Sequence, residues 1–147
     1  MSLRLKEHVT ANGLRVLVEE NPEVRSAAVG FLVDTGSRDE TPEIAGVSHF
    51  LEHMAFKSTK KRGAHEVLLA LDNLGSKANA YTAYERTVFH AQVLPEFAVE
   101  VMQLLAEMIN PALKKEDFDL EKNVIIEEIE MYNDIPEFLL FDTLMER

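Results

Sequence analysis

The chain of 147 residues contains no cysteine. Disulfide bonds and thiolate metal sites are therefore excluded, and any metal must be held by histidine and carboxylate side chains. No stretch approaches the roughly 18 consecutive apolar residues that a membrane span requires. The first ten residues, MSLRLKEHVT, also lack the apolar segment of a signal peptide. We therefore expect a soluble, unsecreted protein of the cytoplasm without a membrane partner.

Basic residues are few, with 15 lysines and arginines against 26 aspartates and glutamates and a formal net charge of -11. A surface of this sign repels phosphate, which argues against nucleic acids and anionic membranes as partners. No repeat, low-complexity segment or flexible linker divides the chain. Its hydrophobic content of 46% is sufficient for a core. One domain over residues 1–147 is the simplest interpretation.

The sequence pattern predicts an α+β fold, in which helices pack on one face of a mainly antiparallel sheet. β-Branched residues between turn formers predict strands over residues 14–20, 26–36, 77–84 and 87–94, with a hairpin-like start. Helical patterns cover residues 44–56, 64–73, 95–109 and 115–132, and a last one begins at Pro136. This last pattern reaches Arg147 without a stop signal, so we expect a domain that is truncated at its C-terminus.

The stretch GVSHFLEHMAFK puts two histidines and a glutamate on one predicted helix. His49 and His53 are four residues apart, so their imidazoles share a face and can converge on one point, with Glu52 beside it. Two converging imidazoles are a usual start of a zinc site, and the carboxylate can accept a proton from metal-bound water. Because Glu52 is the only charged residue from Ile44 to Phe56, we expect this helix to be buried on most sides. The alternative is a pair of core histidines bonded to backbone carbonyls.

The helix predicted over residues 115–132 carries two carboxylates within its apolar arc. Glu121 and Glu128 are seven residues apart and stack on that arc, whereas Asp119 and Glu127 fall on the polar side. A core-facing carboxylate needs a cation or hydrogen bonds, and zinc would supply the cation. Boundary glutamates that reach around to solvent are the alternative.

Four basic residues follow the histidine helix and are interpreted as a solvated loop. They are Lys57, Lys60, Lys61 and Arg62. The remaining histidines have no partner at ligand spacing, so we interpret them as surface or core residues. They are His8, His65 and His90.

Taken in order, these motifs resemble the pitrilysin family of zinc peptidases, which includes insulin-degrading enzyme and the mitochondrial processing peptidase. The likeness rests on the inverted H-x-x-E-H motif, on the E-x6-E pair that ends about 75 residues later, and on the stretch NAYTAYERT. It extends to NGLRVLVEE, VGFLVDTGSRDE and EKNVIIEEI. The resemblance implies the N-terminal part of a zinc metalloendopeptidase. It implies His49, His53 and Glu128 as Zn²⁺ ligands, Glu52 as general base and Glu121 as an acidic residue that supports the ligands.

The same resemblance implies the substrate and the partners. Asn79 and Ala80 would lie on an edge strand that binds the backbone of a peptide or unfolded protein by strand addition. Relatives enclose the peptide between two halves, so the partner would be a missing C-terminal half or a partner subunit. Apolar surface meant for that part would favour a homo-oligomer. A non-catalytic scaffold subunit and a purely structural metal site remain alternatives; the first typically has a degraded motif, and the second needs a fourth protein ligand.

Overall fold

The computed structural model describes residues 4–145, and its fold is α+β, as predicted. The strands are β1 (Arg4–Val9), β2 (Arg15–Glu20), β3 (Ala27–Val33), β4 (Lys77–Thr82) and β5 (Thr87–Val93). The helices are α1 (Val47–Ala55), α2 (Ala64–Asn73), α3 (Ala98–Met108), α4 (Lys115–Asn133) and α5 (Pro136–Met145). Within this range no helix is at once long and apolar enough to traverse a membrane. The cytoplasmic compartment stays a prediction.

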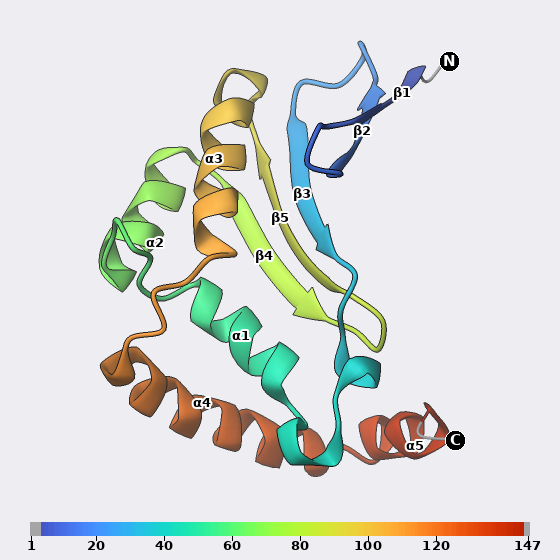
Figure 1. Ribbon diagram of the computed structural model, residues 1–147, viewed down its shortest axis with the longest axis vertical. Helices are drawn as coiled ribbons and strands as arrows, with labels where there is room; N and C mark the ends of the chain where they lie inside the picture. The colour runs from blue at the N-terminus through green and yellow to red at the C-terminus, as the bar shows by residue number, and fades with distance from the viewer. Residues whose placement is uncertain (1–3, 146–147) are drawn as a thin grey trace.

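The main sheet has the strand order β3-β5-β4, and every neighbouring pair is antiparallel. Side chains of β5 alternate, so that Phe89, Ala91 and Val93 are buried while His90 and Gln92 are exposed. The buried side meets α2 and α3, which cover one face of the sheet (Figure 1). This apolar core consists of Val67, Leu71, Ala91, Val93, Val101, Leu104, Leu105 and Met108. The predicted packing of helices on one face is thus confirmed.

The predicted hairpin-like start exists, but its strands are β1 and β2. The turn between them contains Gly13, whose φ of +87° lies in the left-handed region that favours glycine. The next predicted strand, β3, pairs with β5 in the other sheet. There, Val29 and Phe31 of β3 pack against the helical core. The strand with which β3 pairs depends on this packing. The residues of the local turns do not indicate it.

Helix α1 contacts β4 on one side and α4 on another, below the sheet in the view of Figure 1. Its first turn is capped by Glu40, whose carboxylate accepts the N–H groups of Gly46 at 2.6 Å and Ser48 at 2.7 Å. Burial raises the pKa of Glu40, but these hydrogen bonds outweigh it and hold the pKa below its ordinary value. The cap fixes the start of the helix that carries the histidines.

Among the described residues, α1 is buried or half-buried on most sides, as expected, and is exposed on one. Ser48, Met54 and Ala55 are buried, but Val47 is 39% exposed and Leu51 is 44% exposed. Val47 and Leu51 are four residues apart, so they form one apolar face that residues 4–145 leave uncovered.

A second exposed apolar surface runs along α4 and α5. Leu120, Val124 and Met131 lie on one face of α4 and are 69%, 48% and 53% exposed. On α5, Leu139, Leu140 and Leu144 are also exposed. Apolar surface of this kind normally meets other protein.

We expect the isolated 147-residue chain to self-associate through the apolar face of α4. Sedimentation velocity over a range of concentrations should show mass increasing with concentration, and Leu120→Glu with Val124→Glu should reduce this increase. A single monomeric species at all concentrations would contradict the prediction.

Shortening the core side chain of Leu105 should destabilise the fold strongly. Leu105 is fully buried on α3, so Leu105→Ala is expected to lower the free energy of unfolding by about 2–5 kcal/mol. Val99 on the same helix is 58% exposed, and Val99→Ala should cost less than about 1 kcal/mol. Urea denaturation of both variants measures the difference, and equal midpoints would contradict the assigned core.

Candidate metal centre

Three potential ligand side chains converge between α1 and α4: His49, His53 and Glu128. The two imidazole Nε2 atoms are 3.0 Å apart. Glu128 Oε2 lies 3.2 Å from His53 Nε2, and its Oε1 lies 3.8 Å from His49 Nε2. The three side chains are 31%, 19% and 25% exposed, in the same order. The group is therefore partly shielded and still reachable from solvent.

The spacing and chemistry of this group fit zinc. With Zn–N and Zn–O bonds of about 2.0–2.1 Å, donor atoms around a tetrahedral ion lie about 3.3 Å apart. The separations of 3.0, 3.2 and 3.8 Å bracket that value. Among the described residues the group comprises three side chains. A three-ligand set leaves one position open, as in catalytic zinc sites.

Helix α4 presents a row of carboxylates to α1 and the segment that follows it, formed by Asp117, Glu121 and Glu128. Spacings of four and seven residues keep all three on one helical face. The adjacent Glu127 is exposed. The helical-wheel argument that separated Glu128 from Glu127 therefore agrees with the observed orientation, while the role of Glu128 as a ligand stays a prediction.

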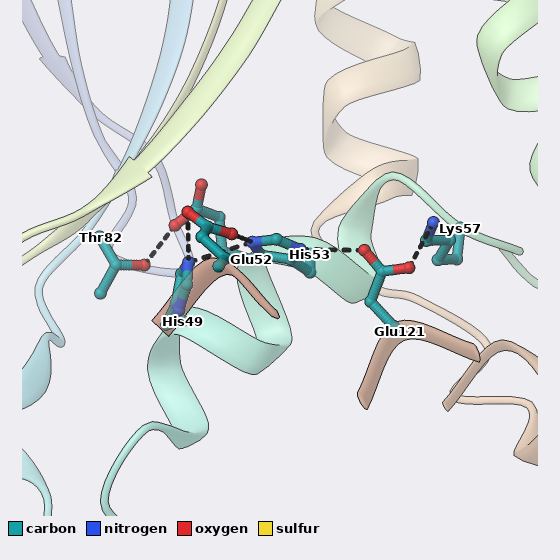
Figure 2. Close-up of polar contacts among 7 residues, drawn as sticks. His49, Glu52, His53, Lys57, Thr82 and Glu121 are labelled. Carbon is teal, nitrogen blue, oxygen red and sulfur yellow. Dashed lines mark hydrogen bonds and ion pairs between the residues drawn. The ribbon is translucent and has the colours of Figure 1, made fainter. Parts of the chain in front are cut away.

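Glu121 lies behind the histidines, and its side chain is only 6% exposed. Its Oε1 is 2.9 Å from His53 Nδ1, and its Oε2 is 2.5 Å from Lys57 Nζ (Figure 2). Burial raises the pKa of Glu121, but the bonds from Lys57 and His53 outweigh burial and hold the pKa below its ordinary value. An ionised carboxylate only accepts hydrogen bonds, so His53 Nδ1 is the donor in its contact with Glu121. The other ring nitrogen, Nε2, faces His49 and Glu128.

Glu52 projects from α1 toward the end of β4. The Thr82 hydroxyl donates a hydrogen bond of 2.6 Å to Glu52 Oε2 (Figure 2). Within residues 4–145, no described contact engages Glu52 Oε1. Glu52 therefore has one oxygen fixed by the sheet and one oxygen available beside the histidines.

Asn79 and Ala80 lie on β4, which is one of the two edge strands of the described three-stranded sheet. The predicted edge position is confirmed. The Ala80 N–H donates a hydrogen bond of 2.9 Å to the Asn79 side-chain oxygen. Thr82, which holds Glu52, follows on the same strand. Binding of a peptide to this edge stays a prediction.

Two residues of the site were missed from the sequence. Thr82 went unnoticed, and Lys57 was interpreted as part of a solvated loop, which is wrong because it pairs with Glu121. The spacing could have indicated the role of Lys57. It follows His53 by four residues, the same interval that separates His53 from His49. Arg62 of that loop also has a partner, Glu107.

The chain is similar to proteins named as zinc proteases in several bacteria. It is 44% identical over 141 residues to the uncharacterized zinc protease YmxG of Bacillus subtilis, covering 95% of this chain and 34% of that protein. It is 44% identical over 134 residues to the uncharacterized zinc protease ML0855 of Mycobacterium leprae, covering 90% and 30%. The chain thus spans about a third of the length of these curated relatives.

The fold is similar to the crystal structure of a protease from Helicobacter pylori, with a TM-score of 0.84 and 28% sequence identity. The likeness covers 90% of this chain and 32% of that one. The family model described as Insulinase (Peptidase family M16) matches residues 15–147, nearly the whole chain. The resemblance inferred from the motifs is confirmed, and the chain belongs to the insulinase family of peptidases, family M16.

Proposed function

We propose that this chain forms the metal-binding catalytic part of a zinc metalloendopeptidase. His49, His53 and Glu128 would hold Zn²⁺, and Glu52 would act as general base. The observation that carries the proposal is the convergence of three ligand atoms at 3.0–3.8 Å with a free carboxylate oxygen on the same helix. The intact set weighs against the alternative of a non-catalytic scaffold subunit.

Zinc bound at this group would lower the pKa of water and polarise the carbonyl of the scissile peptide bond. Glu52 would take the proton of the attacking water on Oε1, because Thr82 already occupies Oε2. The same oxygen would then deliver the proton to the nitrogen of the leaving amine. Thr82 keeps the carboxylate oriented during both transfers.

The substrate class follows from the position of β4. A peptide or unfolded protein that pairs with this edge strand would lie in extended conformation next to Thr82 and Glu52. Main-chain hydrogen bonds would supply affinity that depends little on the peptide sequence. Asn79 and Ala80 would contribute to that edge.

Catalysis by the whole protein would involve more than this chain. The relatives are about three times as long, and the exposed apolar faces of α1 and α4 provide surface for further protein. We propose that a C-terminal half or a partner subunit covers these faces and encloses the substrate.

Zinc binding tests the ligand set. The full-length protein should bind about one zinc per chain by elemental analysis, and His49→Ala and Glu128→Ala should weaken binding by more than the roughly 10–100-fold that loss of an outer partner costs. Glu127→Ala is the matched control because Glu127 is the exposed neighbour. Absence of zinc from a folded wild-type protein, or equal loss in Glu127→Ala, would contradict the assignment.

The substitution Glu52→Gln separates metal binding from proton transfer. In the full-length protein the variant should keep its zinc and lose about 10²–10⁴-fold in kcat on a peptide substrate, because the amide cannot accept the proton. Peptide cleavage followed by mass spectrometry measures the rate, with zinc content determined on the same sample. Wild-type turnover in a zinc-loaded variant would show that Glu52 is not the base.

A further inference from the structure

Lys57 approaches the metal centre from the side opposite the zinc ligands. Its Nζ lies 2.5 Å from Glu121 Oε2, and the other oxygen of the same carboxylate is 2.9 Å from His53 Nδ1. The Lys57 side chain is 31% exposed, whereas that of Glu121 is 6% exposed. Figure 2 shows the resulting row of side chains from Lys57 through Glu121 to His53.

The backbone around Lys57 is held in place. The Lys57 N–H donates a 3.1 Å hydrogen bond to the Met54 carbonyl at the end of α1. The next residue, Ser58, donates its N–H to Asp117 Oδ2 at 3.2 Å and accepts the Ala112 N–H at 2.8 Å. The backbone from which the Lys57 side chain extends is therefore fixed.

The Glu121 carboxylate is held at both of its oxygens. A buried carboxylate without a counter-charge is costly, and Lys57 supplies that charge. Because Lys57 and His53 bind different oxygens, they also fix the plane of the carboxylate. Without Lys57, Glu121 would keep one of its two anchors and would hold the imidazole less firmly.

We propose that Lys57 is a positioning residue of the metal centre. Acting through Glu121, it holds the His53 imidazole in the orientation that places Nδ1 on Glu121 and directs Nε2 at Glu128. The part that concerns metal affinity rests on the proposed zinc site, whereas the part that concerns the ring orientation does not. Partners that orient metal-bound imidazoles in this way affect both ligand geometry and affinity.

Zinc titration of the full-length protein against a competing chelator tests the first part. Lys57→Met should weaken zinc binding about tenfold, the low end for outer partners, because Lys57 acts through one intermediate residue. Lys57→Arg should restore most of the affinity, since a guanidinium keeps the charge and the N–H donors. Lys60→Met is the matched control, because Lys60 is exposed and makes no hydrogen bond or ion pair among the described residues 4–145.

A double-mutant cycle shows whether Lys57 acts through Glu121. Glu121→Gln removes the charge that Lys57 contacts, so adding Lys57→Met to it should cause no further loss of zinc affinity. Independent, additive losses would overturn the proposal. So would wild-type affinity in Lys57→Met, or equal losses in Lys57→Met and Lys60→Met.

The orientation of the imidazole provides a readout without zinc. Crystal structures of the metal-free protein should show one His53 ring orientation, with Nδ1 on Glu121, in the wild type and in Lys57→Arg, and a displaced ring or several ring orientations in Lys57→Met. An unchanged His53 ring in folded Lys57→Met would overturn the proposal. If the wild type binds no zinc but the ring moves as expected, the zinc peptidase assignment fails and the positioning role of Lys57 stands.

Discussion

The buried carboxylate of Glu121 is the group on which the geometry of the candidate metal centre depends. It lies between a histidine of α1 and a lysine that follows the same helix, and it is itself anchored on α4. Its charge is tolerated because both neighbours donate to it. Through this single group, the orientation of His53 and the docking of α4 are determined together.

The site combines three kinds of support. The turn of α1 sets the spacing of His49 and His53, the row of carboxylates on α4 brings Glu128 to them, and the end of β4 holds Glu52 through Thr82. Helix α1 is in contact with both of the other elements. The core of the sheet with α2 and α3 therefore provides the base, while the candidate metal centre lies at its lower end in the view of Figure 1.

Much of this arrangement was predictable from local pattern. Helical periodicity placed His49 and His53 on one face and set Glu128 apart from Glu127, because both inferences need only the geometry of a single helix. Pairing between distant segments was less accessible. Strand β1 was not singled out, the hairpin partner was misassigned, and Lys57 was interpreted as solvated, since each of these depends on which surfaces meet after folding.

Helix α4 is attached to the molecule in an unusual way. Ile125 is its one buried apolar residue, and no described residue of α4 belongs to either apolar cluster of the core. Its contacts with α1 include the histidine–carboxylate pairs and one ring contact between Phe50 and Phe118, and Lys57 after α1 adds a further ion pair. An ion held jointly by α1 and α4 would therefore act as a cross-link between them. By linkage, the free energy of metal binding would be expressed largely as the docking free energy of α4. Removal of the metal would then loosen α4 and leave the sheet with α2 and α3 intact.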